Sequence, residues 1–263
     1  MMAQARLLTK QGYLPAQLRV GCAGWAITKQ YASRFPATGS HLERYAECLR
    51  AVEVNSCFYR SHRPSTYARW AAETPPQFAF SLKLPKEITH ERRLVKTDGA
   101  ISRFLAETAE LGPKRGAILV QLPPSLAFDA KLVENFFTTF RRQYDGEVVC
   151  EPRHVSWFTL EPETLLTRLK VARVAADPSV ARRGAEPGGW GGTVYYRLHG
   201  SPQMYRSQYP AQHLVVLANA LVRSIATANT WCIFDNTALG AAAGDALSLV
   251  ERIEELIRPP HGD

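Results

Sequence analysis

The sequence predicts one α/β domain, a closed parallel (β/α)₈ barrel of the TIM type. Eight short stretches rich in apolar and β-branched residues alternate along the chain with amphipathic stretches of helical periodicity. A length of 263 residues suits a single barrel of this kind. Several of the β-rich stretches also end in a charged or amide side chain, and TIM barrels form their sites at the carboxyl ends of their strands.

The expected strands are short. In chain order they are Leu18–Cys22, Ala51–Asn55, Phe78–Lys83, Ala117–Gln121, Glu147–Glu151, Val171–Ala176, Thr193–His199 and Trp231–Asp235. An open, doubly wound sheet is the alternative architecture. It is less well supported, because no GxGxxG fingerprint follows the first strand.

Local start and stop signals delimit the expected helices. Ser40 and Asp129 are suitable N-cap residues, and Gly112-Pro113 is a strong terminator. The expected helices are His41–Leu49, Ser65–Glu73, Ala100–Leu111, Ala130–Arg142, Glu163–Leu169, Ala211–Thr227 and Ala241–Ile257. The link Asp177–Gly192 is rich in Gly and Arg and predicts a long loop. We expect an N-terminal extension over residues 1–17, the barrel over 18–258 and a tail over 259–263.

Composition indicates a cytoplasmic protein without a membrane partner. No apolar run reaches 18 residues, and residues 1–15 lack the apolar segment of a secretory signal. The five cysteines include no CxxC pair, so neither a disulfide framework nor a zinc ribbon is indicated. A reducing cytoplasm is therefore the expected location.

The polar residues at the strand ends are the candidate site. Because side chains alternate across a strand, they share the inward face with apolar residues that fill the barrel. The strand-end set comprises Glu53, Lys83, Gln121, Glu151, Arg197, His199 and Asp235. Asn55, which lies on the same face as Glu53, is a further ligand-binding candidate.

Two roles are open for each member of the pair formed by Glu53 and Lys83. Glu53 is either a general base or metal ligand, or the partner of Lys83 in a structural ion pair on the neighbouring strand. Lys83 is either a charge partner or phosphate contact, or a desolvated amine that forms a Schiff base. A carboxylate beside Lys83 would keep it protonated and favour the first role.

A second group of candidates follows the fifth and seventh strands. Glu151 and His154 offer acid–base chemistry, and Arg153 offers a bidentate grip on a carboxylate or phosphate. Arg197 and His199 stand two apart on one strand, so they face the same way and favour a joint role. For His154, a structural role is the alternative.

A metal site is a weaker hypothesis. Separate strand ends supply oxygen and nitrogen donors, but no HxH or HExxH spacing appears, so no metal ligand is assigned. The donors in question are Glu53, Glu151, Asp177, His199 and Asp235. The sequence indicates no specific cofactor.

Aromatic and basic residues cluster in the loops that follow the strand ends. Trp25, Tyr59 and Trp157 are candidates for stacking on a ligand, with packing over the barrel mouth as the alternative. The formal charge is +8, and a basic rim that attracts anions is expected from Arg60, Arg63, Lys86, Arg92, Arg93 and Arg206.

Several motifs resemble those of the YecE-like family, catalogued as domain of unknown function 72. They are Gly21-Cys22-Ala23-Gly24-Trp25, Glu53-Val54-Asn55-Ser56-Cys57-Phe58-Tyr59-Arg60, Phe80-Ser81-Leu82-Lys83-Leu84-Pro85, Gln121-Leu122-Pro123-Pro124-Ser125, Glu151-Pro152-Arg153-His154-Val155-Ser156-Trp157, Arg197-Leu198-His199-Gly200 and Phe234-Asp235-Asn236-Thr237. The last motif has Asp235 where the family usually has asparagine, and it adds Asn236 to the ligand-binding candidates. The resemblance implies a TIM barrel and no established activity.

Together these features favour an enzyme or enzyme-derived binder. We expect a phosphate-bearing or other anionic ligand at the carboxyl ends of the strands, with phosphoester hydrolysis or sugar-type isomerisation as the reaction class. The alternative is a non-catalytic nucleic-acid-binding protein that uses the basic rim.

Overall fold

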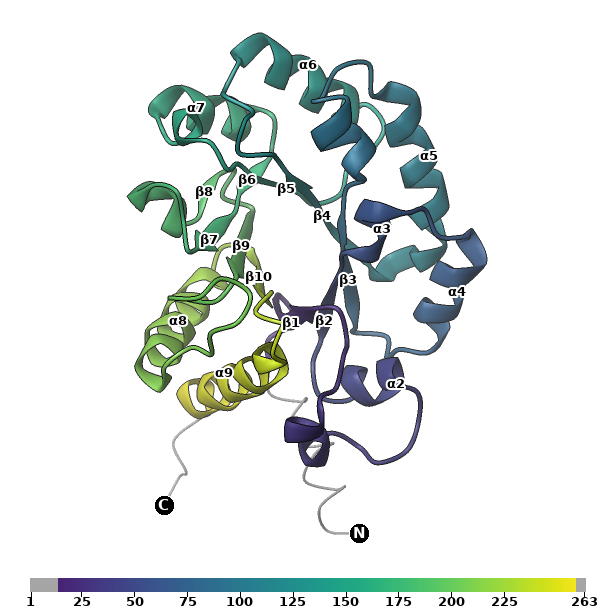
Figure 1. The fold of residues 1–263 in the computed structure, drawn as a ribbon, viewed down its shortest axis with the longest axis vertical. Coiled ribbons are helices and arrows are strands. Elements are labelled where there is room, and N and C mark those ends of the chain that lie inside the picture. Colours follow the sequence, from purple (N-terminus) through teal and green to yellow (C-terminus); the bar gives the residue numbers. More distant parts are fainter. Residues whose placement is uncertain (1–13, 259–263) are drawn as a thin grey trace.

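The computed structural model describes residues 14–258, in which helices surround a curved sheet (Figure 1). The expected tail 259–263 and residues 1–13 of the expected extension lie outside the described part. No helix within residues 14–258 combines the length and the apolar composition that a bilayer crossing requires.

Ten strands form one sheet in the order β7-β9-β10-β1-β2-β3-β4-β5-β6-β8. All neighbouring pairs are parallel except β6 and β8. The strands are β1 Leu18–Ala23, β2 Ala51–Val54, β3 Ala79–Lys83, β4 Arg115–Gln121, β5 Val148–Glu151, β6 Ala172–Arg173, β7 Ala175–Asp177, β8 Gly188–Gly189, β9 Thr193–Leu198 and β10 Asn229–Phe234.

The sheet is nearly closed and barrel-like, and it differs from the expected eight-stranded parallel barrel at the sixth strand. The expected strand Val171–Ala176 is split at Val174 into β6, which pairs with β5, and β7, which pairs with β9. The chain therefore changes its pairing partner from β5 to β9 within a few residues. The backbone N–H of Val174 donates to the carbonyl of Cys150, which keeps the split strand against β5.

The antiparallel strand β8 was not expected, and its glycines explain it. It lies within the Gly-rich loop that follows β7, and it pairs with β6. A Cβ atom on Gly189 would lie 2.5 Å from the carbonyl oxygen of Val171, so only glycine permits this approach. The buried Arg173 guanidinium binds Glu163, which also accepts from the Gly189 N–H at 2.6 Å. The rest of this loop holds only a short 3₁₀ helix, Arg182–Ala185.

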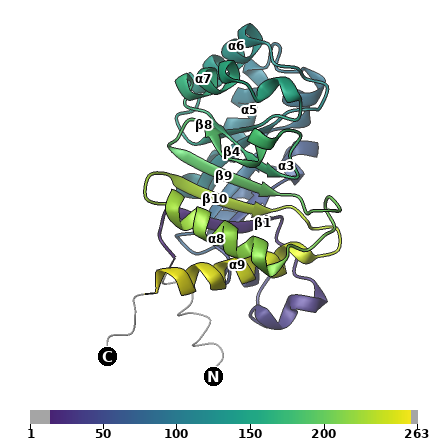
Figure 2. The same ribbon diagram turned by 90° about the vertical axis from the view of Figure 1, so that its left-hand side faces the viewer.

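The α-helices lie on the outer side of the sheet (Figures 1 and 2). Ser40 and Glu43 form a capping box at the first of these helices, and Asp129 caps α6, as their positions predict. The helices are α2 His41–Ala46, α3 Ser56–Tyr59, α4 Pro64–Ala72, α5 Asp98–Thr108, α6 Ala130–Arg141, α7 Leu160–Arg168, α8 Ala211–Ser224 and α9 Ala241–Ile257. The short α3, directly after β2, was not expected. Shorter helical turns also occur, among them a π-helical turn at Glu87–Glu91.

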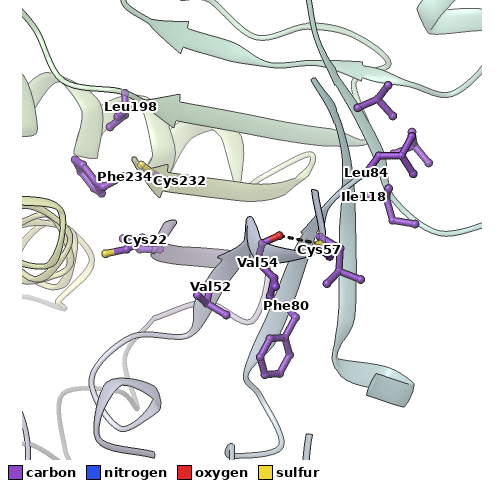
Figure 3. Close-up of a cluster of buried hydrophobic side chains, with 14 of the residues drawn as sticks. Cys22, Val52, Val54, Cys57, Phe80, Leu84, Ile118, Leu198, Cys232 and Phe234 are labelled. Carbon is purple, nitrogen blue, oxygen red and sulfur yellow. Dashed lines mark hydrogen bonds between the residues drawn. The ribbon is translucent and has the colours of Figure 1, made fainter. Parts of the chain in front are cut away.

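Side-chain alternation sorts the apolar residues into two layers. Val52, Phe80 and Ile118 belong to the large layer that also holds the helix side chains (Figure 3). Their neighbours of opposite parity form the second, smaller cluster on the other face of the strands: Ala51, Ala79, Ala117, Leu119, Val149, Ala172, Val174, Tyr195, Trp231 and Ile233. This second cluster is the inside of the curved sheet, and the polar strand-end residues continue the same files.

We predict that Gly21→Ala destabilises the fold. The new Cβ would lie 1.9 Å from the backbone oxygen of Ala51 on the paired strand, so β1 and β2 would have to separate. We expect a loss of about 1–3 kcal/mol in the free energy of unfolding, measured by urea denaturation. Gly99→Ala in α5 is the matched control, because its Cβ would meet no atom within 4 Å. An unchanged midpoint for Gly21→Ala would contradict the close pairing of these strands.

Candidate functional site

One guanidinium, that of Arg197 on β9, binds carboxylates from three other strands. Its Nη2 lies 2.7 Å from Oε1 of Glu53, which is on β2, and 3.0 Å from Oδ2 of Asp235, which follows β10. Its Nη1 lies 3.1 Å from Oε2 of Glu151, at the end of β5. Arg197, Glu53 and Glu151 are fully or almost fully buried. We call these four residues, with His199 and Arg153, the Arg197 network.

Tyr195 and Gln121 complete the hydrogen bonding around Arg197. The Tyr195 hydroxyl lies 2.8 Å from Glu53 Oε2, to which it donates, and 2.9 Å from the hydroxyl of Ser81. Gln121 accepts from Arg197 Nη1 at 3.2 Å. Tyr195 is not among the site residues predicted from the sequence. The signal for its polar role was its place two residues before Arg197, on the same face of β9.

His199 lies between two carboxylates. Its Nδ1 is 3.0 Å from Oδ2 of Asp235, and its Nε2 is 2.9 Å from Oε1 of Glu151. The Nη2 of Arg153 lies 2.7 Å from the same Nε2 and 2.5 Å from Glu151 Oε1. A proton on Nδ1 is held by Asp235, whereas Nε2 can either accept from Arg153 or carry a proton that it donates to Glu151. The surroundings therefore accommodate both charge states of the imidazole.

The network favours the ionised forms of Glu151 and Asp235. Burial alone would raise the pKa of Glu151, but Arg197, Arg153 and His199 hold that pKa well below its usual range. Burial opposes ionisation of Asp235 as well, and Arg197 and His199 lower its pKa. In return, the three carboxylates raise the pKa of Arg197 well above its usual value, against the effect of burial.

Lys83 stands apart from this network. The ion pair with Glu53, one of the two roles left open by the sequence, does not form, because both oxygens of Glu53 bind Arg197 and one also binds Tyr195. Among the described residues no carboxylate oxygen lies within 4.0 Å of Lys83 Nζ and no acceptor binds it; the ammonium instead lies 4.2 Å from the centre of the Phe58 ring. Burial lowers the pKa of Lys83, and the nearby Arg197 lowers it further.

The sequence places the chain in a known family. The profile described as "Protein of unknown function DUF72" matches residues 19–261. The chain belongs to the DUF72 family. It is 34% identical over 129 residues to UPF0759 protein YecE of Escherichia coli strain K12, a match that covers 48% of this chain and 47% of YecE. It is 27% identical over 148 residues to UPF0759 protein YunF of Bacillus subtilis strain 168, covering 53% of this chain and 52% of YunF. The chain thus matches about half the length of these curated relatives.

Two solved DUF72 structures share the fold. A DUF72 family protein of Enterococcus faecalis V583 superimposes with a TM-score of 0.78 at 20% identity, over 94% of this chain and all of that one. A DUF72 family protein of Thermotoga maritima MSB8 superimposes with a TM-score of 0.75 at 22% identity, over 90% of this chain and 99% of that one. At such identities the likeness concerns the fold alone.

Several of the motifs shared with the DUF72 family contribute to this end of the barrel, but not all of their residues join the Arg197 network. His154 Nδ1 lies 2.8 Å from the Ser156 hydroxyl and accepts from the Ser156 backbone N–H, so it caps the turn after β5. Trp157 is fully buried and donates from Nε1 to the carbonyl of Leu126. Asn236 is also fully buried and donates to Asp245 and to the Ser207 carbonyl.

The remaining ligand-binding candidates from the DUF72 motifs lie nearer the surface. Trp25 packs edge-on against Trp70, and it lines a cavity of about 360 Å³ at the carboxyl ends of β1 and β2 together with Asn55. The Oδ1 atom of Asn55 is buried and has no hydrogen-bond partner among the described residues. Tyr59 is 77% exposed and contacts Phe58 edge-on.

Part of the expected basic rim is neutralised by its own neighbours. Lys86 pairs with Glu91 at 3.5 Å, and Arg92 pairs with Glu87 at 2.6 Å. Arg93 donates to the hydroxyl and the carbonyl of Ser125. The described residues also include no group of three His, Cys, Asp or Glu side chains placed to hold a metal ion.

We predict that Arg197→Met is among the most destabilising single changes in this chain. It leaves three buried carboxylates without their common partner, and the expected loss is about 3–5 kcal/mol in the free energy of unfolding at neutral pH. Arg92→Met is the control, because its ion pair is exposed and is worth at most about 1 kcal/mol. Denaturant unfolding of both variants measures the difference, and equal losses would contradict the central role of Arg197.

We predict the opposite effect for Lys83→Met. Folding removes the Lys83 ammonium from water without giving it a carboxylate, so the neutral side chain should leave stability unchanged or raise it at neutral pH. Because the folded pKa of Lys83 lies below the ordinary 10.5, the unfolded chain binds more protons between those two values. The stability of the wild-type protein should therefore rise relative to Lys83→Met as the pH increases through that window. A large loss of stability in Lys83→Met at pH 7 would instead indicate a buried ion pair.

Proposed function

We propose that the carboxyl end of the barrel binds a small molecule that carries a carboxylate or phosphate group, and that the protein is an enzyme. One observation carries this proposal. Arg153 and Lys83 both have N–H groups that donate to no acceptor among the described residues. The Nε of Arg153 is buried without a hydrogen-bond partner, and among the described residues its Nη1 also has none. An oxyanion would satisfy these donors.

The charges of the buried groups support the same proposal. Glu53, Glu151 and Asp235 all bind Arg197, and Glu151 also binds Arg153. Lys83 takes part in none of these contacts, and among the described residues no carboxylate oxygen lies within 4.0 Å of its ammonium. An anionic ligand would pair with this ammonium, and Glu151 holds Arg153 through Nη2 while the Nε and Nη1 of Arg153 have no partner among the described residues.

The chemistry best supported is proton transfer on a carbonyl or sugar-like substrate, of the sugar-isomerase kind. His199 is held by Asp235 at Nδ1, and its Nε2 has both a donor and an acceptor beside it, so it can exchange a proton. Glu53 is less suited to general-base catalysis, since Arg197 and Tyr195 occupy both of its oxygens. The small-ligand proposal is preferred to a nucleic-acid backbone, because Lys86 and Arg92 of the rim already pair with acidic neighbours.

Titration calorimetry with inorganic phosphate and with pyruvate tests the anion site. Arg153→Met should weaken binding by roughly tenfold to a hundredfold, as expected for the loss of charge-assisted hydrogen bonds. Arg92→Met, a change on the rim, should leave the affinity unchanged. Equal affinities in all three proteins would contradict the proposed role of Arg153.

Single-stranded and duplex oligonucleotides provide the competing test. If the rim binds a nucleic-acid backbone, the logarithm of the affinity should fall by about 0.7–0.9 per phosphate contact for each unit of log salt. The combined Arg92→Ala and Arg93→Ala variant would then show a slope reduced by roughly one to two units. We expect no such binding at low salt, and a steep salt dependence would favour the nucleic-acid alternative over a small anionic ligand.

A further inference from the structure

We propose that the amine of Lys83 is a nucleophile that forms a Schiff base with a small carbonyl compound carrying a carboxylate or phosphate. This inference rests on the proposed anion site at Arg153. Only β4 separates β3 from β5, so Lys83 and Arg153 follow strands that end at the same edge of the sheet. Neither the family assignment nor the related structures give Lys83 a role.

The surroundings of Lys83 are those of a reactive amine and not of a structural cation. Its side chain is buried at the end of β3, with the residue 8% exposed. Among the described residues it has neither a carboxylate partner nor a hydrogen-bond acceptor. Lys114 is the contrasting case, because its ammonium donates to the carbonyls of Ala71 and Thr74 and to the Thr74 hydroxyl.

The nearest group to the amine is an aromatic ring. Phe58 lies in α3, and its ring centre is 4.2 Å from Lys83 Nζ. The thiol of the preceding Cys57 donates to the carbonyl of Val54 at 3.0 Å (Figure 3) and also lies 3.1 Å from the carbonyl of Lys83. These contacts hold α3 against the end of β3. A cation–π contact of this kind is worth only about 0.5–2 kcal/mol, much less than a buried ion pair.

The same surroundings make the ammonium easier to deprotonate, and the neutral amine that results is the form that attacks a carbonyl. Burial removes water from the ammonium, and the guanidinium of Arg197 repels it. Glu53, Glu151 and Asp235 attract the ammonium, but each of them is already paired with Arg197. A lysine that is desolvated beside another cation is one of the known ways to activate this nucleophile.

The covalent step balances without a further reagent. The lone pair of the Lys83 nitrogen attacks the carbonyl carbon to form the C–N bond, and the oxygen takes up a proton. The nitrogen loses its extra proton, and the resulting carbinolamine eliminates its oxygen as water when a second proton is supplied. The net change consumes one amine, one carbonyl and one proton, and gives one iminium ion and one water. The positive iminium then withdraws electrons from the adjacent carbon and favours the proton transfer assigned above to His199.

Reductive trapping tests the proposal. The full-length protein is treated with sodium borohydride in the presence of pyruvate, dihydroxyacetone phosphate or neutral dihydroxyacetone, and the adduct is located by peptide mass spectrometry. Hydride reduces the iminium carbon and leaves a stable secondary amine. We expect an adduct on Lys83 with an anionic carbonyl, at least tenfold more than on Lys114 or Lys86, and far less with dihydroxyacetone. The yield should rise with pH through a midpoint below that of an exposed lysine.

Matched variants separate this inference from the proposed anion site. Lys83→Arg should lose the adduct, while Lys86→Arg should keep both the adduct and phosphate binding. Arg153→Met should weaken phosphate binding and lower the adduct yield at low pyruvate concentration. Phosphate binding without any Lys83 adduct would overturn the Schiff-base inference and leave the anion site standing. A Lys83 adduct whose yield is the same with and without Arg153 would overturn the anion site instead.

Discussion

A single guanidinium that binds three buried carboxylates is the interaction on which this end of the barrel depends. Glu53, Glu151 and Asp235 come from strands that are far apart in the sequence, and none of them could stay ionised in the core without a partner. Arg197 suits this position because its planar fork offers five donors in fixed directions, whereas lysine offers a compact charge. Removing Arg197 would therefore affect three strands together.

The geometry of the other groups follows from this arrangement. Once Glu151 and Asp235 are fixed by Arg197, the imidazole of His199 lies between them, with one ring nitrogen facing each carboxylate. Glu151 in turn holds one nitrogen of Arg153 and leaves the others without a protein partner. The carboxylates thus serve mainly to orient the cations and the imidazole. The chemistry would fall to His199, Arg153 and Lys83.

The sequence predicted the parity of the strand-end residues but not their partners. Strict alternation placed Glu53, Lys83 and Arg197 on the inner face, and the network confirms that face for Glu53 and Arg197. The expected pair of Glu53 and Lys83 came from neighbouring strands. Inside a curved sheet, however, a long side chain from β9 reaches β2 across the interior, and periodicity along the chain contains no information on such contacts.

Local signals were most misleading where one residue type serves two purposes. For His154, acid–base chemistry and a structural role were both open from the sequence. Its contacts fit the structural role, because its ring caps a turn through Ser156, two residues along the chain. Tyr195 packs in the inner apolar cluster, yet its hydroxyl donates a hydrogen bond to Glu53. The split of the sixth strand could not be predicted either. The split depends on which residues pair with β5 and which pair with β9. The apolar pattern of Val171–Ala176 would be the same for one continuous strand and for two short ones.

The basic residues of the rim and of the interior differ in their pairing. Lys86 and Arg92 of the rim have carboxylate partners, whereas Lys83 in the interior has none among the described residues. On the rim, Lys86 and Arg92 form ion pairs with glutamates that are five residues away in the sequence. These glutamates largely neutralise the two positive charges. Inside, the carboxylates bind Arg197, Arg153 and His199, and among residues 14–258 none of them lies within 4.0 Å of the Lys83 ammonium. A buried cation without a counter-ion is costly to the fold. Such a cost is typical of groups that act on a ligand, since stability alone would favour an apolar residue at that position.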